Sequence, residues 1–203
     1  AQPPTIHDFG GFPKELLEVK YPAPGSPELA ERLQKLLSPA KVALDQDWGL
    51  DHGTWSVLVH MFPKADVPVV QLSMDRHQPP AFHYEFGRRL AHLREEDVLL
   101  LGSGNIVHNL RAAKWEKNAK PYDWANVFNT LTTQLIENRQ HAALIAYEGL
   151  GDAAALAVPT PEHYLPLLYI LGTQREDEVA KIVMEGIDMG SISMTSVGVG
   201  MAS

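Results

Sequence analysis

Residues 98–101 form a continuous apolar run, Val-Leu-Leu-Leu, which ends at two closely spaced glycines, Gly102 and Gly104. A run that is apolar on both faces of the pleat predicts a buried strand that is covered on both sides. The two glycines permit a backbone geometry or a close approach that a Cβ atom excludes. In open α/β sheets the loop after the carboxyl end of a strand is where ligands bind. His108 follows within this loop. It is therefore a candidate functional residue, and the alternative is a histidine that merely caps the next element.

Apolar periodicity elsewhere in the chain predicts alternating helices and strands. Ser26 and Pro27 are suited to the cap and the first position of a helix whose leucines fall on one face. Further helices are predicted from Trp55 to Phe62 and over residues 79–93 and 123–138. Strands are predicted over residues 41–44, 67–74, 98–101, 181–184 and 191–199. We expect one α/β domain with a central mixed, mostly parallel sheet that is flanked by helices.

Composition narrows the classes of function. The 203 residues are enough for one domain with a substantial core, and the formal net charge of −8, without a basic run, argues against nucleic-acid binding. No stretch reaches the length of a membrane span, and the first residues do not resemble a signal peptide, so we expect a cytoplasmic protein that does not bind membranes. Cysteine is absent, which leaves histidine and carboxylate as the side chains able to hold a metal ion.

Two further histidines lie in informative surroundings. His52 stands between Asp51 and Gly53 and is flanked by two tryptophans, which suits the wall of a pocket in which Asp51 could orient the imidazole. His163 follows Glu162 in a first helical turn that Thr160 is suited to cap. Successive helical residues point about 100° apart, so Glu162 and His163 are not expected to bind one ion together. Glu162 could equally be a favourable charge at the positive end of the helix.

The remaining histidines are expected to be structural or solvated. His60 is expected at the surface or in packing, His77 in a polar loop, and His141 in a polar connection. His83 and His92 are nine positions apart on one predicted helix, about two and a half turns, so they are expected to be solvated rather than to chelate one ion. His7 lies in an aromatic, glycine-rich loop and either lines a pocket or points outward. Spacing alone thus predicts an α/β domain with a histidine-rich site, without a compact metal motif.

Seven stretches in the same order resemble the class III extradiol ring-cleaving dioxygenases of the LigB type, in the branch that is similar to 4,5-DOPA extradiol dioxygenases. They are TIHDFGGFP at 5–13, YPAPGSPEL at 21–29, WGLDHGTW at 48–55, VVQLS at 69–73, SGNIVHNL at 103–110, PTPEHYLPL at 159–167 and GSISM at 190–194. The matches run nearly the whole length of the chain, which makes the resemblance specific. It implies a LigB-like fold.

The resemblance also implies roles for individual residues. His163 matches a histidine ligand of the metal, and His108 matches the active-site histidine that acts as acid and base and also approaches the metal. His52 matches a residue near the hydroxyl groups of the substrate, and His7 is a candidate for substrate binding. Two family motifs with further metal-ligating histidines, His-Gly-Ser-Pro and Ser-Ala-His-Trp, do not occur here. Residues 1–203 are accordingly expected to be a single LigB-like catalytic domain that lacks its N-terminal strands and holds part of the site.

The reaction that the resemblance implies is ring opening of a catechol, such as L-DOPA, by O₂ to a muconic semialdehyde. Fe(II) is the cofactor expected for activity, and Zn(II), which has no redox chemistry, is a further ion that a nitrogen-rich site accepts. A histidine is suited to take the catechol proton because its pKa is near neutral. Two alternatives remain, a zinc-dependent hydrolase with His108 as base and a non-catalytic remnant with an incomplete metal site. The sequence does not indicate the oligomeric state.

Overall fold

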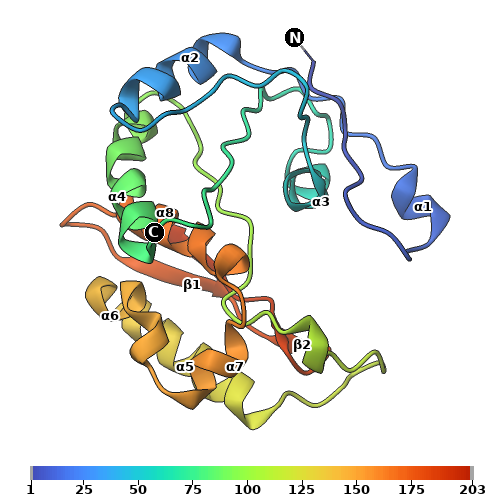
Figure 1. Ribbon diagram of the computed structural model, residues 1–203, viewed down its shortest axis with the longest axis vertical. Helices are drawn as coiled ribbons and strands as arrows, with labels where there is room; N and C mark the ends of the chain where they lie inside the picture. The colour runs from blue at the N-terminus through green and yellow to red at the C-terminus, as the bar shows by residue number, and fades with distance from the viewer. Residues whose placement is uncertain (1, 202–203) are drawn as a thin grey trace. The chain divides into compact units, whose positions relative to one another are not determined.

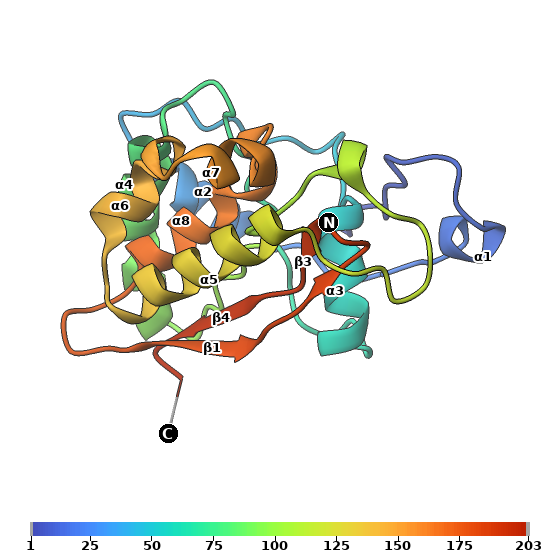
Figure 2. The ribbon, with the colours of Figure 1, turned by 90° about the horizontal axis from the view of Figure 1, so that it is seen from below.

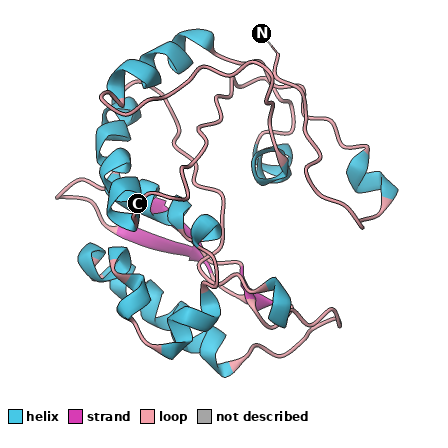
Figure 3. Cartoon of the chain, in the orientation of Figure 1, coloured by secondary structure: helices cyan, strands magenta, loops and turns pink. Residues whose placement is uncertain are grey.

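The computed structural model describes residues 2–201, and the chain divides into two compact units. The first unit ends at Ser73 and the second begins at Met74. The first unit contains three helices joined by long loops (Figure 3), namely α1 (Lys14–Leu17), α2 (Pro27–Leu36) and α3 (His52–Met61). Its core is a cluster of buried side chains around Tyr21, Leu50 and Trp55.

The helix predicted to begin after Ser26 is confirmed as α2. Ser26 is its N-cap, and its hydroxyl oxygen accepts the N–H of Leu29 at 3.3 Å. Leu33 and Leu37 are buried, as the predicted leucine face requires. The local signals were sufficient here because a cap, a first-turn proline and an apolar face all agree.

The second unit is mostly helical. Its α-helices are α4 (Pro80–Leu90), α5 (Asp123–Glu137), α6 (His141–Ile145), α7 (Asp152–Ala157) and α8 (Leu165–Gly172). Its 3₁₀-helices are η1 (Ala91–Glu95), η2 (Leu110–Ala112), η3 (Tyr147–Gly149) and η4 (Pro161–His163). The predicted helices over 79–93 and 123–138 are confirmed as α4 with η1 and as α5. The helical spacing of the apolar residues in this segment predicts that six of them face inward, namely Trp124, Val127, Phe128, Leu131, Leu135 and Ile136. Of these, Phe128 and Ile136 are fully buried, whereas Val127 is 56% exposed.

The strands of the structure lie near the end of the described chain and pair antiparallel. β1 (Ala180–Met184) pairs with β4 (Ser196–Val199), and β2 (Ile187–Asp188) pairs with β3 (Ile192–Ser193). Helix α5 lies along the paired strands β1 and β4 (Figures 1 and 2). The strand predicted over 181–184 is thus confirmed as β1, whereas the one predicted over 191–199 is divided into β3 and β4. Buried side chains from α5, α6, α7 and α8 form the core of this unit.

The central, mostly parallel sheet is not present in residues 2–201. The predicted strands over 41–44 and 98–101 are extended chain without a ladder, and the one over 67–74 contributes an isolated parallel bridge between Gly25 and Val69. Leu99 is 62% exposed and Leu101 is 47% exposed, so the run is not covered on both faces here. An apolar run shows that side chains favour burial, but it does not supply the neighbouring strand whose backbone completes a sheet.

Two histidines that were expected in polar surroundings are buried. His83 on α4 is fully buried, and its Nδ1 lies 3.1 Å from the hydroxyl oxygen of Tyr169. His141 at the start of α6 is 8% exposed, and its Nδ1 lies 2.8 Å from the hydroxyl oxygen of Tyr84. The prediction for His83 was wrong, because a hydroxyl from another helix provides a hydrogen-bond partner for one ring nitrogen, Nδ1, inside the core. His60, His77 and His92 are exposed.

These buried imidazoles predict an acid-sensitive fold. Burial lowers the pKa of His83, against the opposing effects of the Gln78 carbonyl and the Asp75 carboxylate, and burial likewise lowers the pKa of His141. Below the ordinary histidine pKa of about 6.5, the unfolded chain therefore binds more protons than the folded chain. The contribution of these groups to the free energy of unfolding is complete above that pH and is lost as the pH falls below it.

Each imidazole contributes at most about 1.4 kcal/mol per pH unit to this loss. Urea unfolding of the full chain between pH 7.5 and pH 5 measures it. His83→Gln is expected to reduce the pH slope, and His92→Gln, which changes an exposed histidine of η1, is expected to leave it unchanged. Equal slopes for His83→Gln and the parent chain would contradict the prediction.

No helix among residues 2–201 is long and apolar enough to cross a membrane.

Candidate active site

The structure stacks two of the predicted site residues, His108 and His163, against each other. Their ring centroids are 3.4 Å apart and their planes differ by 10°. His108 is fixed by its backbone, whose N–H donates to the carbonyl of Ala157 at 2.8 Å, and by an antiparallel bridge to Ile192. His163 is the last residue of η4, directly before α8. Both side chains are partly buried, so this is a pair of accessible imidazoles on a fixed backbone.

The two glycines of the sequence motif allow the chain to pass close to η4 and α8. A Cβ atom on Gly104 would lie 2.2 Å from the carbonyl oxygen of His163, and one on Gly102 would lie 2.7 Å from that of Pro166. Such contacts are too short for any side chain. The expectation that these glycines permit a close approach is confirmed. The motif brings the loop that carries His108 to the helix start that carries His163.

The carboxylate of Glu162 interacts electrostatically with this imidazole pair. The Glu162 Oε1 accepts the hydroxyl of Thr160 at 2.7 Å. Burial opposes the ionisation of Glu162, but this hydrogen bond and the nearby His163 and His108 hold its pKa below the usual value. Burial lowers the pKa of His108, and the Glu162 charge partly offsets the effect. His108 is consequently neutral at neutral pH and able to accept a proton.

Thr160 occupies the predicted N-cap position, but its hydroxyl does not cap the helix. It donates to Glu162 instead, and the first turn is the 3₁₀-helix η4 rather than the start of an α-helix. Glu162 is therefore a hydrogen-bonded carboxylate beside the two histidines. The sequence left open whether it is a site residue or a favourable charge at the start of a helix.

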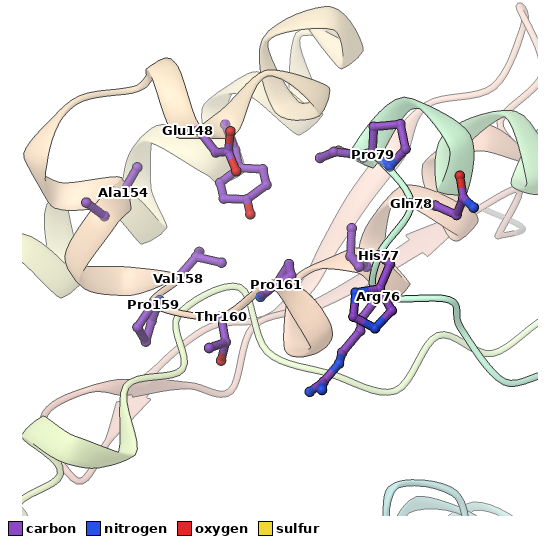
Figure 4. A pocket seen from close by; sticks show the side chains of 14 residues that line it. Arg76, His77, Gln78, Pro79, Glu148, Ala154, Val158, Pro159, Thr160 and Pro161 are labelled. Atoms are coloured by element: carbon purple, nitrogen blue, oxygen red, sulfur yellow. The ribbon is translucent and has the colours of Figure 1, made fainter.

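A cavity of about 500 Å³ lies next to this segment in the second unit. Figure 4 shows Glu148 and Ala154 on one side of it, His77 and Pro79 on the other, and Pro161 between them. Neither His108 nor His163 lines the cavity. The connection is Thr160, which lines the cavity and also donates to Glu162.

Tyr147 contributes a neutral phenol to the same cavity. Burial raises its pKa, and the charges of Glu148 and Glu162 raise it further. A ligand in this cavity meets a neutral hydroxyl group, the Arg76 and His77 side chains and the exposed Glu148.

His52 lies in the first unit, where Asp8 orients its ring. The Nδ1 of His52 is 2.7 Å from Asp8 Oδ1, which also accepts the backbone N–H of His52 at 3.1 Å. Burial of Asp8 opposes its ionisation, but these bonds from His52 hold its pKa below the ordinary value. The suggested partner, Asp51, is the N-cap of α3 and accepts the N–H of Thr54 at 3.1 Å. The idea that Asp51 orients His52 was therefore wrong.

His7 lies in the same aromatic cluster of the first unit. Its Nε2 is 3.0 Å from the carbonyl oxygen of Val19, and its ring is 5.4 Å from that of Trp55. The Phe9 ring lies between the two histidines in the contact network, 6.1 Å from His7 and 5.5 Å from His52. The structure thus groups His7 with His52 and groups His108 with His163. The substrate-binding roles of His7 and His52 stay predictions.

The described residues do not complete a metal site. Residues 2–201 contain no group of three His, Cys, Asp or Glu side chains that could hold a metal ion. The lone pairs of an imidazole lie in the ring plane, so two parallel rings direct them side by side rather than toward one point. In this arrangement the ring nitrogens of His108 and His163 do not converge on one point.

Sequence reasoning missed two polar residues, Asp8 and Asn105. Asp8 lies 44 residues from His52, and Asn105 lies 58 residues from His163, which it contacts through a side-chain hydrogen bond of 3.2 Å. Spacing cannot reveal such partners. The signal available was their place inside two motifs that also contain candidate histidines, TIHDFGGFP and SGNIVHNL.

Comparisons with known proteins agree with the resemblance to LigB-type dioxygenases. The family model of the catalytic LigB subunit of aromatic ring-opening dioxygenase matches residues 1–200. The 4,5-DOPA dioxygenase extradiol of Escherichia coli K12 is 53% identical over 205 residues, which cover 98% of this chain and 74% of that protein. The Beta vulgaris protein of the same name is 39% identical over 196 residues, which cover 95% of this chain and 72% of that protein. A crystal structure of an uncharacterized E. coli K12 protein aligns with a TM-score of 0.82 at 46% identity, over 97% of this chain and 80% of that one.

Proposed function

We propose, for a chain that belongs to the LigB family of aromatic ring-opening dioxygenases, that His108 takes a proton from a catechol hydroxyl during ring cleavage. The chain is an extradiol ring-cleaving dioxygenase, and its reactants are a catechol and O₂. The single observation that supports the assignment to His108 is its stacked position on His163, with a pKa that burial lowers. A neutral imidazole is a competent base, and a hydroxyl that loses its proton becomes more electron-rich and easier to oxidise.

His163 is proposed as the metal ligand of the pair. LigB-family enzymes depend on a non-haem metal, for which His163 would be one ligand, and such a metal would supply the means to bring the catechol and O₂ together. We propose Fe(II) for activity, and Zn(II) as an ion that the same nitrogen donors accept. The described residues offer no group of three side chains that could hold this metal. The further prediction that His108 also binds the metal requires the two rings to leave their parallel arrangement.

L-DOPA is proposed as a substrate on the strength of the relatives' names, which include 4,5-DOPA dioxygenase extradiol from E. coli and from Beta vulgaris. His52 is proposed to hydrogen-bond the substrate, since Asp8 holds its Nδ1 and leaves its orientation defined. His7 is proposed as a second substrate-binding residue. A cytoplasmic location is proposed as well, in keeping with the chain's lack of cysteine.

The zinc hydrolase and the non-catalytic remnant are less consistent with these comparisons. The family match and the relatives' names all describe ring-opening or dioxygenase activity. None describes a hydrolase.

The test is an oxygen-uptake assay on the full chain, loaded with Fe(II) and given L-DOPA or a simple catechol under air. We expect oxygen consumption together with a yellow ring-cleavage product, and no product under nitrogen. An ester substrate serves as the matched control for hydrolysis. Ester turnover that does not consume oxygen would support the hydrolase instead. No turnover of either substrate would support the non-catalytic remnant.

A further inference from the structure

The side-chain amide of Asn105 lies between the His163 ring and a buried backbone carbonyl. Its Nδ2 donates to the carbonyl oxygen of Ser193 at 2.7 Å, and its Oδ1 lies 3.2 Å from Nδ1 of His163. The three residues are far apart in sequence and belong to the loop after residue 101, to β3 and to η4. The Ser193 carbonyl, the Asn105 amide and the His163 ring form one continuous hydrogen-bonded chain, which ends at Nδ1 of His163.

The direction of the amide follows from its partner at Ser193. A backbone carbonyl can only accept, so the atom of Asn105 that faces it must be the NH₂ group. The oxygen of the amide must then face His163. This hydrogen-bond partner resolves the usual ambiguity between the nitrogen and oxygen atoms of an asparagine side chain.

The orientation of the amide determines which nitrogen of the His163 ring is protonated. An amide oxygen cannot donate, so Nδ1 of His163 must carry the hydrogen that joins them. We propose that Asn105 is a positioning residue that fixes the tautomer of His163, with the proton on Nδ1 and the lone pair on Nε2. The hydrogen bond at one ring nitrogen decides which of the two is protonated. The Nε2 atom is then the one with which His163 can accept a proton or bind a metal.

The surrounding backbone makes this hydrogen-bonded chain rigid. Ser193 is 1% exposed and exchanges two bonds with Val107, one from its own N–H to the Val107 carbonyl at 2.9 Å and one from the Val107 N–H to its hydroxyl at 3.0 Å. The backbone N–H of Asn105 also donates to the carbonyl of His163 at 2.9 Å. Asn105 is therefore held to His163 by its backbone and by its side chain at once. The Gly104 contact described above permits this approach.

The importance of the tautomer for ring cleavage rests on the proposed function, in which His163 is the ligand of the pair. The assignment of the tautomer itself does not rest on the proposed function. The tautomer is a property of the folded chain without metal or substrate, so it can be measured even if the protein cleaves no catechol.

Nitrogen-15 NMR of the histidine rings in the full, metal-free chain tests the proposal, read at the alkaline end of a pH titration. Two variants separate the roles of the amide. Asn105→Ala removes the acceptor for Nδ1, whereas Asn105→Asp keeps an acceptor oxygen for Nδ1 but replaces the donor to Ser193 with a carboxylate oxygen and adds a negative charge. Asn109→Ala is the matched control, because its amide bonds only to backbone groups of Leu156 and Ala112 in the same region.

In the parent chain we expect Nδ1 of His163 at a protonated position and Nε2 at an unprotonated one. Asn105→Asp and Asn109→Ala are expected to keep this pattern. Asn105→Ala is expected to lose it, with the Nδ1 and Nε2 shifts moving toward each other as the two tautomers exchange.

Two results would overturn the proposal. One is a parent spectrum with the proton on Nε2, and this measurement does not depend on whether any variant folds. The other is a folded Asn105→Ala chain that retains a single Nδ1-protonated tautomer. Loss of catechol cleavage with an intact Nδ1-protonated spectrum would instead reject the proposed function and leave the tautomer assignment standing.

Discussion

His108→Gln is expected to lower kcat for catechol cleavage about 10²- to 10⁴-fold, the range that a positioned general base contributes. Glutamine occupies a similar volume but cannot take up a proton at any working pH. The backbone bond from His108 to Ala157 does not involve the ring, so the loop is expected to remain in place. Initial rates of oxygen uptake with L-DOPA, measured on the Fe(II)-loaded full chain, give the comparison.

The control for this variant is His92→Gln, which changes an exposed histidine of the same unit and should leave kcat unaltered. Thermal unfolding of both variants checks that the fold is retained. A His108→Gln chain that turns over at the parent rate would remove His108 from the role of base. An equal loss in His92→Gln would show that the effect is not specific to the stacked pair.

Gly104→Ala is expected to destabilise the chain by about 1–3 kcal/mol or more, the usual cost of forcing extra volume into a packed region. The added Cβ would meet the carbonyl oxygen of His163 at 2.2 Å and the side chain of Pro166 at 3.1 Å. One obstacle is backbone, which cannot rotate away. In a chain of this size each kcal/mol lowers Tm by roughly 2–4 °C.

Gly149→Ala is the matched control, because a Cβ at that position has nothing within 4 Å. Its free energy of unfolding is expected to stay within about 0.5 kcal/mol of the parent value. Equal stability of Gly104→Ala and Gly149→Ala in urea unfolding would show that the loop does not need its close approach to His163. Where Gly104→Ala remains folded, we expect catechol cleavage to fall, since His163 must shift to relieve the contact.

Local signals predicted the helices well and the sheet poorly. Helix α2 was located by the cap residue Ser26 and by Pro27, and helix α5 by the apolar spacing of residues such as Phe128 and Ile136. Each of these signals acts within a few residues. Leu99 and Leu101 looked like a buried strand, yet they are exposed in extended chain. A strand is completed by backbone partners elsewhere in the sequence, and hydrophobicity alone does not identify them.

The candidate site divides in the same way. The motifs predicted His108 and His163 as site residues, and the structure stacks their rings. Gly102 and Gly104, which precede His108, explain how the two distant segments approach each other. The residues that orient the imidazoles, Asp8 and Asn105, were not identified, because a hydrogen bond across more than 40 positions leaves no periodic pattern. The buried His83 was misassigned for a related reason, since its partner Tyr169 comes from another helix.

The backbone contact between Gly104 and His163 has a consequence for how substrate range can change in a family like this one. The segments that carry the two stacked rings meet through main-chain packing, because the backbone of Gly104 lies against the carbonyl of His163. Residues of the cavity wall such as Arg76, His77 and Glu148 are not part of this contact. Libraries that aim at a new substrate range are therefore best designed with residues 102–105 left constant.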